Sequence, residues 1–326
     1  MTLANLPPLV TVIGGSGFVG RYVVGALAKR GYRIRVVCRR PDLALFLQPL
    51  GNVGQISFVQ ANLRYPDSVK TAVEGSDHVI NCVGLLAESG KNTFKSVQEQ
   101  GAAVVAAAAK AIGAKLTHLS AIGADANSAS IYASTKGRAE KAVLDAIPDA
   151  IIIRPSVVFG PEDDFFNKFA AMAKTLPVLP LIGGGQTKFQ PIYAGDVAEV
   201  VARSVDGVLK PGAVYELGGQ DVLTFEECLK LVLKTIGRKR ALMTLPFGLA
   251  SLIGKIAEKI PLITPPLTGD QVELLHKDNV VSDAAEAAGL TIKGLGISPV
   301  LVNSVLSDYT VHFRPQGQFT RMSKAA

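Results

Sequence analysis

Apolar residues follow two different periods along the first half of the chain. Short, nearly continuous apolar runs predict buried strands at residues 9–13, 33–38, 56–60, 78–82, 115–119 and 150–153. Between these runs, apolar residues recur at helical spacing and predict helices at residues 18–29, 66–74, 93–112 and 131–146. Strands that alternate with crossover helices are typical of a parallel sheet with helices on both faces, so we expect a doubly wound α/β fold.

The pattern becomes less regular after Arg154. Prolines and glycines separate shorter elements, with a strand expected at residues 214–217 and helices at 224–236, 246–260 and 268–277. We therefore expect a first domain over residues 1–160 and a smaller C-terminal α/β lobe over residues 161–326. The lobe would interleave with the first domain and end in an extended tail.

The composition narrows the class of protein. Hydrophobic residues make up 48% of the chain and charged residues 19%, which is typical of a globular protein. No apolar stretch is long enough for a spanning helix, and residues 1–8 lack the parts of a secretory signal. The 3 cysteines and 4 histidines lack metal-ligand spacing, so we expect no metal site. The net charge of +7 is mostly dispersed, so we expect no nucleic-acid partner.

The first expected strand leads directly into a glycine-rich turn and a helix. The residues of this turn are Gly14, Gly15, Ser16, Gly17, Phe18, Val19 and Gly20. Gly14 permits the sharp turn, Gly17 lets the backbone approach a pyrophosphate, and Gly20 allows close packing of helix on sheet. Backbone N–H groups at the helix start would face the anion. The sequence therefore predicts a dinucleotide site of the Rossmann type.

The second expected strand ends at Arg39 and Arg40, where NAD-specific proteins usually place an acid. A guanidinium group can pair with the 2′-phosphate of NADP(H) through two hydrogen bonds, and the missing acid removes a repulsion. This pattern favours NADP(H) over NAD(H) as the cofactor. A solvated arginine pair at a strand end is the alternative interpretation.

Two further strand ends point toward the same site. Asn62 and Leu63 follow the third expected strand, where an amide can reach the adenine edge and an apolar neighbour can cover the ring. A simple turn asparagine explains Asn62 nearly as well. Val83 and Gly84 follow the fourth strand, and glycine there lets the backbone pass close to the nicotinamide-side ribose.

Ser120, Tyr132 and Lys136 have the spacing of a catalytic group. Tyr132 and Lys136 stand four positions apart on an expected helix, so both project from one face, and Ser120 follows the fifth strand. With the glycine turn, this arrangement resembles the short-chain dehydrogenases/reductases. The resemblance implies that the tyrosine exchanges a proton with a carbonyl or alcohol, the lysine binds the nicotinamide ribose, and the serine orients the substrate. Two interpretations stay open: catalysis, or a tyrosine and lysine that only hold the ribose.

Longer motifs in the second half narrow the resemblance. Residues 154–161 read RPSVVFGP, as in extended and atypical members of that family, and residues 162–167 continue with EDDFFN. Further matching segments are residues 189–193 with 195–197, 268–275 with 278–282, and 313–319. Together they resemble the NAD(P)H-binding accessory subunits of respiratory complex I, NADH:ubiquinone oxidoreductase. That resemblance implies tightly held NADP(H) and docking on peripheral-arm subunits of complex I near the membrane, without a demonstrated reaction.

Other functions and the location of the protein stay open at this point. Because Ser120, Tyr132 and Lys136 are all present, an NADP-dependent carbonyl reductase, for example in quinone metabolism, is the alternative to the accessory subunit. A redox-state sensor or an RNA-associated scaffold of the same fold is a third hypothesis. The chain begins almost directly at its first strand, so we expect a bacterial or a processed protein. Its place would be the cytoplasmic face of the bacterial inner membrane or the mitochondrial matrix side.

Residues 246–260 predict an amphipathic helix that is too short to span a membrane. Its apolar stripe comprises Phe247, Leu249, Leu252, Ile253, Ile256 and Ile260, with Lys255 and Lys259 beside it. Such a stripe can lie on a membrane surface or a partner subunit, or pack against its own domain. The sequence leaves these alternatives open.

Overall fold

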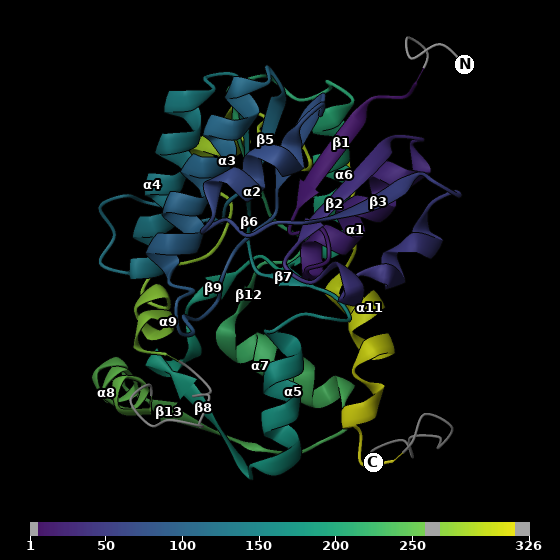
Figure 1. The fold of residues 1–326 in the computed structure, drawn as a ribbon. Coiled ribbons are helices and arrows are strands. Elements are labelled where there is room, and N and C mark those ends of the chain that lie inside the picture. The colour runs from purple at the N-terminus through teal and green to yellow at the C-terminus, as the bar shows by residue number, and fades with distance from the viewer. Residues whose placement is uncertain (1–5, 258–267, 317–326) are drawn as a thin grey trace. The chain divides into compact units, whose positions relative to one another are not determined.

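A seven-stranded parallel sheet forms the centre of the first of two compact units. The computed structural model describes residues 6–257 and 268–316, with the backbone alone for residues 255–257 (Figure 1). The strands are β1 (Leu9–Ile13), β2 (Arg33–Cys38), β3 (Ile56–Gln60), β4 (His78–Asn81), β5 (Lys115–Leu119), β6 (Ile151–Pro155) and β11 (Val214–Leu217). They lie in the order β11-β6-β5-β4-β1-β2-β3, and each neighbouring pair is parallel. The chain winds outward in both directions from β1, so the expected Rossmann-type fold is confirmed.

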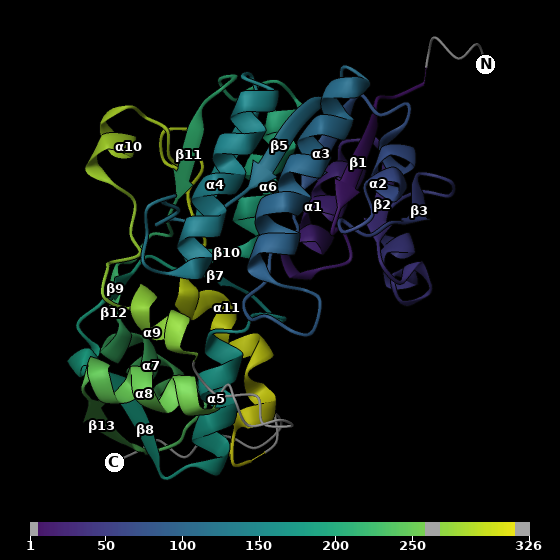
Figure 2. The same ribbon diagram turned by 60° about the vertical axis from the view of Figure 1, so that its left-hand side comes forward.

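Helices cover both faces of this sheet (Figure 2). They are α1 (Phe18–Lys29), α2 (Pro66–Val73), α3 (Gln100–Ala111), α4 (Ile131–Ala146) and α6 (Ala194–Val205). α1 packs beside α6 on one face, and α3 packs between α2 and α4 on the other. Ala102, Ala106 and Ala109 of α3 are fully buried, because alanine lets this helix approach the sheet closely.

The expected helix at residues 93–112 is two elements, which corrects the sequence-based prediction. A π-helical turn, η4 (Phe94–Glu99), precedes α3. Thr93 begins the turn, and its hydroxyl accepts a hydrogen bond from the backbone N–H of Ser96 at 3.0 Å. A π-helical turn carries an extra residue, which the spacing of apolar positions over one turn does not reveal.

The first unit is discontinuous in sequence. It comprises residues 1–155, 194–217 and 283–297. β11 lies in the second half of the chain, and Val214 of β11 pairs with Ile152 of β6 at the end of the main sheet. The short helix α10 (Asp283–Ala287) belongs to this unit as well. Two 3-10 turns, η2 (Pro41–Leu43) and η3 (Leu45–Leu50), connect β2 to β3.

The second unit comprises residues 156–193, 218–282 and 298–326. Its helices are α5 (Phe166–Thr175), α7 (Phe225–Thr235), α8 (Phe247–Ala257), α9 (Gly269–Leu274) and α11 (Val302–Tyr309), with 3-10 turns η5 (Gly183–Gly185) and η6 (Val311–Phe313). Its strands form short pairs: β7 (Val158–Phe159) with β10 (Ile192–Tyr193), β8 (Val178–Ile182) with β13 (Ala241–Leu245), and β9 (Lys188–Phe189) with β12 (Leu223–Thr224). A core of aromatic rings, among them Phe166 and Phe225, holds the unit together.

Candidate nucleotide-binding site

The glycine-rich turn joins β1 to α1 in a geometry that requires glycine. Gly14 has φ +80°, and its N–H donates to the Val37 carbonyl at 2.8 Å. A Cβ at Gly20 would overlap the Gly14 carbonyl oxygen, so a side chain there would push α1 away from the turn. Within the described chain, α1 has no side-chain cap, because its N-cap residue is Gly17. Such a helix start presents N–H groups and the positive end of the helix dipole to an anion.

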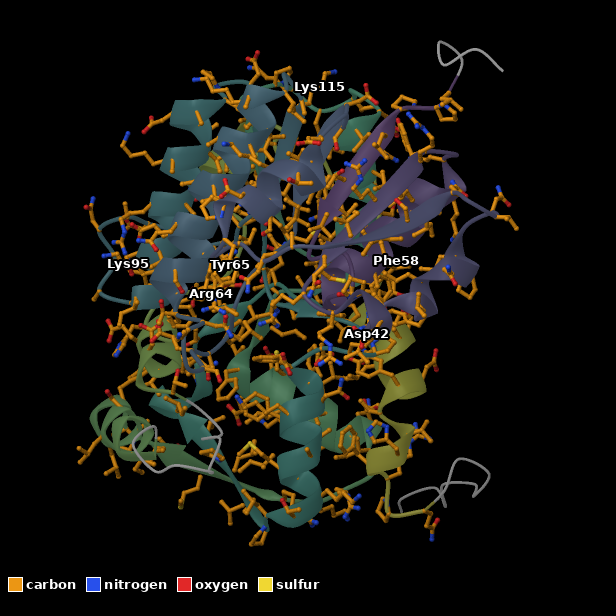
Figure 3. The ribbon with its side chains drawn as sticks, viewed as in Figure 1. Asp42, Phe58, Arg64, Tyr65, Lys95 and Lys115 are labelled. Atoms are coloured by element: carbon orange, nitrogen blue, oxygen red, sulfur yellow. The ribbon has the colours of Figure 1, made fainter. Side chains whose placement is uncertain are left out.

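The strand ends that carry the other expected residues lie at one edge of the sheet. In Figure 3, Lys115 at the start of β5 lies at the top, whereas Asp42 and Arg64, which follow β2 and β3, lie at the lower edge. All sheet strands are parallel, so the glycine turn after β1 is at this carboxyl edge too. Ligands of doubly wound sheets bind at the carboxyl edge, where the strand order reverses.

Arg39 and Arg40 differ in their surroundings although both are exposed. Arg40 donates to both carboxylate oxygens of Asp42, from Nε at 3.2 Å and from Nη2 at 2.9 Å. That pairing raises the pKa of Arg40 and lowers the pKa of Asp42. Across the part of the chain that the structure describes, the Arg39 guanidinium has no such partner. Arg39 is therefore the arginine whose charge is available to a phosphate.

The end of β3 provides a polar turn and an arginine. Asn62 Oδ1 accepts from the Arg64 N–H at 3.1 Å, so the side-chain oxygen of Asn62 supports its own turn. Leu63 is 8% exposed and packs against Gly101 of α3, within the core. Arg64 was not among the sequence-predicted residues. Its Nε atom is buried without a hydrogen-bond partner among the described residues.

The loop after β4 lies against the Lys136 side chain. Val83 donates its N–H to Asn81 Oδ1 at 3.1 Å, and a Cβ at Gly14 would touch the Val83 side chain. A Cβ at Gly84 would lie 3.5 Å from Lys136 Nζ, so glycine at this position leaves space beside the amine. The residues expected to approach the nicotinamide-side ribose from two different segments are thus brought together.

Lys136 is buried in an environment that lowers its pKa. The side chain is 4% exposed, and its Nζ donates to the Leu119 carbonyl, next to Ser120, at 3.1 Å. Burial lowers the pKa of Lys136 to about 8, although the charges of Glu140 and Cys82 act in the opposite direction. Ser120 is 5% exposed, and its Oγ has no hydrogen-bond partner among the described residues.

Side chains of the π-helical turn η4 contact both the loop after β4 and helix α4. Phe94 packs edge to face on the half-buried Tyr132 ring, with the ring centroids 5.8 Å apart. Gln98 accepts from the Leu85 N–H at 3.1 Å and donates to Thr135 Oγ1 at 3.1 Å. Gln98 therefore ties the loop after β4 to the helix that carries Tyr132 and Lys136. Sequence reasoning missed Gln98, because it stands among other polar residues, such as Ser96 and Glu99, and nothing local sets it apart.

A buried carboxylate on α4 stands one turn from Lys136 and is held by an ion pair with Arg154 of β6. Glu140, one turn further, is 5% exposed and accepts from Arg154 Nε at 2.9 Å and Nη2 at 2.6 Å. Arg154 Nη1 also lies 3.5 Å from Glu216 Oε1 of β11. The hydrogen bonds to Glu140 raise the pKa of Arg154. The arginine of the RPSVVFGP motif thus fixes the carboxylate that stands one turn from Lys136.

His118 is a neutral buried group beside the same helix. Asn81 Nδ2 donates to His118 Nδ1 at 3.1 Å, which assigns the ring proton to Nε2. Burial, with a smaller contribution from the Lys136 charge, lowers the pKa of His118 to about 3. Among the residues described, its Nε2 has no hydrogen-bond partner.

Comparison with known proteins gives this geometry a family. Residues 10–218 match the NAD dependent epimerase/dehydratase family. The chain belongs to that family. Over 320 residues it is 33% identical to the mitochondrial NADH dehydrogenase (ubiquinone) 1 alpha subcomplex subunit 9 of Arabidopsis thaliana. The aligned region covers 95% of the chain and 79% of the Arabidopsis protein. The resemblance to a complex I subunit, made from motifs alone, is confirmed.

The chain is also similar to a ceramide reductase and, in its fold, to a quinone oxidoreductase. A ceramide reductase of Caulobacter vibrioides is 30% identical over 292 residues, covering 87% of the chain and 90% of that protein. The solved structure of an NADPH-dependent quinone oxidoreductase from Escherichia coli, complexed with NADPH, superposes with a TM-score of 0.71 at 21% identity, covering 91% of the chain and 98% of that structure. At this level of identity the superposition shows the shared fold alone.

Two of the motifs in the second half of the chain, residues 162–167 and 189–193, make hydrogen bonds within the second unit. Asp163 of EDDFFN accepts from the Asn167 N–H at 3.0 Å and from Tyr309 Oη at 2.5 Å. Gln190, from residues 189–193, accepts from the Val281 N–H at 2.9 Å and donates to the Gly219 carbonyl at 3.0 Å. These motifs therefore build the fold of the second unit, whichever chemistry the first unit performs.

The apolar stripe of α8 does not pack wholly against its own unit. Leu249, Leu252 and Ile253 are 49%, 55% and 50% exposed, whereas Ala250 is buried. Phe247 stacks on His276 with the ring centroids 3.9 Å apart. The expected positions of the Ile256 and Lys255 side chains, and of Lys259 and Ile260, lie outside the described residues. No helix within residues 6–257 and 268–316 is long and apolar enough to cross a membrane.

Proposed function

We propose that this protein is an accessory subunit of respiratory complex I that holds NADP(H) as a fixed structural group. In this role it supports the assembly or stability of the peripheral arm near the membrane. The observation that carries the proposal is the 33% identity to a subunit of mitochondrial NADH dehydrogenase, which extends over 95% of the chain. The protein would lie on the cytoplasmic face of the bacterial inner membrane, or on the matrix side of a mitochondrial membrane.

The residues at the carboxyl edge of the sheet fit a dinucleotide with a 2′-phosphate. The uncapped helix start at Gly17 offers N–H groups to a pyrophosphate, and Arg39 offers an unpaired guanidinium to the 2′-phosphate. Lys136, beside Gly84, offers an ammonium group to the nicotinamide ribose. NADP(H) would supply redox chemistry if it were turned over, and otherwise stabilises the unit by binding only its folded state.

The assembly part of the proposal is tested by native electrophoresis. A tagged copy of the chain, expressed from its own locus and extracted in gentle detergent, should migrate with NADH:ubiquinone oxidoreductase activity. Migration only as a free protein would rule out the subunit role. Deletion of the gene should lower the amount of intact complex without lowering the activity per intact complex.

The cofactor part is tested at the two arginines. Arg39→Ala should weaken NADPH binding by about 10- to 100-fold, because a charge-assisted hydrogen bond to the 2′-phosphate is lost. NADH binding should be unchanged, because NADH lacks this phosphate. Arg40→Ala is the matched control, because Asp42 already pairs with that side chain. An equal loss for NADPH and NADH in Arg39→Ala would remove the 2′-phosphate argument.

The exposed face of α8 supports a contact with the membrane surface. Three large apolar side chains on one short helix match the geometry of an interfacial helix. The double variant Leu252→Ser, Ile253→Ser should float less with vesicles of anionic phospholipid than the wild type does. A control variant, Val208→Ser, replaces an apolar residue that is 60% exposed in the first unit. Equal flotation of all three proteins would contradict this contact.

A second candidate function is an NADP-dependent carbonyl reductase. It is favoured by the buried, unpartnered Oγ of Ser120 beside Lys136 and by the 30% identity to a protein named ceramide reductase. Bound NADPH would supply a hydride to the carbonyl carbon, Tyr132 would donate the proton to the carbonyl oxygen, and Ser120 would orient that oxygen. Tyr132→Phe should then abolish turnover and leave the nucleotide bound. Failure of the wild type to oxidise NADPH with a broad set of carbonyl compounds would exclude this function.

A further inference from the structure

Two side chains hold the loop after β4 once it has left the sheet. Backbone pairing with β1 holds the chain as far as Cys82, whose N–H donates to the β1 carbonyl opposite at 2.9 Å. Asn81 Oδ1 then accepts from the Val83 N–H, and Gln98 Oε1 accepts from the N–H that follows Gly84, each at 3.1 Å. The exposed Gly84, where the nicotinamide-side ribose is expected, therefore lies between two fixed amides.

Only one orientation of the Asn81 amide satisfies its neighbours. The Val83 N–H can only donate, so the Asn81 atom that faces it must be the oxygen, Oδ1. The other end of the amide, Nδ2, faces His118 Nδ1 at 3.1 Å. An amide nitrogen can only donate as well, so His118 Nδ1 must accept. If the oxygen and nitrogen of Asn81 were exchanged, both hydrogen bonds would be lost.

His118 meets the requirements for this acceptor. It stands directly opposite Asn81 in the register of β4 and β5, and the two side chains are 1% and 2% exposed. Burial lowers the pKa of His118 to about 3, so the ring is neutral at physiological pH. A neutral ring with its proton on Nε2 has a lone pair on Nδ1. His118 therefore presents an acceptor to the Asn81 amide.

We propose that His118 and Asn81 are positioning residues that hold the loop after β4 against the nicotinamide-side ribose. His118 fixes the orientation of the Asn81 amide, and Asn81 in turn fixes the Val83 N–H. A Cβ at Gly84 would lie 3.5 Å from Lys136 Nζ, so a displaced loop would change the space beside the amine. The proposal rests on the proposed role of the chain in holding NADP(H), and it adds two residues that act on the nucleotide through the loop.

Two ligands separate this role from a general effect on folding. NADPH carries the nicotinamide ribose, whereas 2′,5′-ADP comprises only the adenosine half with its 2′-phosphate. Both are titrated calorimetrically into protein from which bound nucleotide has been removed. His118→Leu cannot accept from Asn81, so NADPH should bind about tenfold more weakly, the effect of one lost buried hydrogen bond. The affinity for 2′,5′-ADP should equal that of the wild type.

A rescue variant and a matched control complete the titrations. The side-chain oxygen of His118→Asn can lie where Nδ1 lies in the wild type, so this variant should regain most of the affinity for NADPH. The control is His78→Leu. His78 is 4% exposed and bonds to Thr117 of β5 at 2.8 Å, but from the opposite end of β4. His78→Leu should lose stability without a selective loss of NADPH.

The tautomer of His118 tests the proposal in the wild-type protein, where no substitution disturbs folding. In protein labelled with ¹⁵N-histidine, the chemical shifts of the ring nitrogens distinguish a protonated nitrogen from an unprotonated one. The signals of His118 are those that His118→Asn lacks. We expect an unprotonated Nδ1 and a protonated Nε2 at neutral pH. A proton on Nδ1 would overturn the proposal, because that nitrogen could not accept from Asn81.

The outcomes separate this proposal from the one on which it rests. If the wild type does not bind NADPH, the role in holding NADP(H) fails and this proposal fails with it. If the wild type binds NADPH and His118→Leu binds it equally well, the positioning role fails and the nucleotide site stands. Equal losses of NADPH and 2′,5′-ADP in His118→Leu would also overturn the positioning role. A selective loss of NADPH that His118→Asn reverses would support it.

Discussion

The protonation state of Lys136 should control how tightly the protein holds its nucleotide. The side chain is 4% exposed, and burial lowers its pKa to about 8. Only the protonated amine can donate a charged hydrogen bond to a ribose hydroxyl. Raising the pH through 8 therefore removes a contact that the nucleotide needs, at a pH where most exposed lysines keep their charge.

The size of the effect follows from this pKa. With a pKa of about 8, roughly 90% of Lys136 is protonated at pH 7 and roughly 10% at pH 9. If only the protonated form binds tightly, NADPH affinity falls about tenfold between these pH values, or about 1.4 kcal/mol. A charged hydrogen bond contributes about 1.5–3 kcal/mol, so the loss at pH 9 is still within the worth of one such contact.

The stability of the nucleotide-free protein should change in the opposite direction. The folded-state pKa of Lys136 is lowered from its usual 10.5, so the unfolded chain binds this proton more tightly. The contribution of Lys136 to stability therefore rises with pH from about 8 to about 10.5. Weaker nucleotide binding at pH 9 is thus not a consequence of unfolding at this group.

Calorimetric titration with NADPH at pH 7, 8 and 9 measures the effect. Lys136→Met should bind NADPH weakly with little pH dependence over this range. Lys136→Arg, which keeps its charge up to much higher pH, should show a flat profile as well. A wild-type affinity that is constant from pH 7 to 9, or a Lys136→Met profile that parallels the wild type, would refute the reasoning.

Three further perturbations test other parts of the site. Gly20→Ala should abolish nucleotide binding and lower the unfolding temperature, since its Cβ would overlap a backbone oxygen. Gly25→Ala is the control, because its Cβ would lie 3.8 Å from the nearest atom, and it should stabilise the fold by about 0.5–1 kcal/mol. Equal effects of the two substitutions would contradict the close packing of the turn. Glu140→Gln removes the charge that pairs with the half-buried Arg154, and it should lower the free energy of unfolding in urea by about 3 kcal/mol. A loss under about 1 kcal/mol would argue against a buried ion pair. Because the pKa of His118 is lowered to about 3, the protein should lose stability as the pH falls below 6.5, since the unfolded chain takes up this proton first. His118→Asn should reduce the slope of unfolding free energy against pH by about 1.4 kcal/mol per pH unit. An unchanged slope would refute the neutral, buried state of His118.

Much of the first unit was predictable because buried parallel strands leave a strong local signal. β1, β2 and β5 begin and end at the expected residues, since the apolar and β-branched residues of each strand stand between polar turns. The glycine turn was predictable as well, because the backbone of the turn itself requires glycine at these positions. Gly14 has a positive φ, and a Cβ at Gly20 would overlap the Gly14 carbonyl oxygen. These features depend on neighbours in sequence.

The features that the sequence did not reveal depend on partners far along the chain. Gln98 reads as a polar residue in a helix until its bonds to the loop after β4 and to Thr135 are seen. Glu140 reads as a surface acid, yet Arg154 makes it a buried one. The π-helical turn before α3 carries Phe94, which packs on the ring of the distant Tyr132, and the period of apolar residues does not reveal such a turn.

The nucleotide content of the assembled complex tests the central claim most directly. NADH:ubiquinone oxidoreductase should be purified from the source organism through a tag on a different subunit, and the nucleotide released by denaturation should be identified and counted. We expect this chain in stoichiometric amount together with one NADP(H) per complex, and we expect that NADP(H) to be missing when the gene is deleted. A purified complex that lacks the chain, or that contains the chain without NADP(H), would contradict the account.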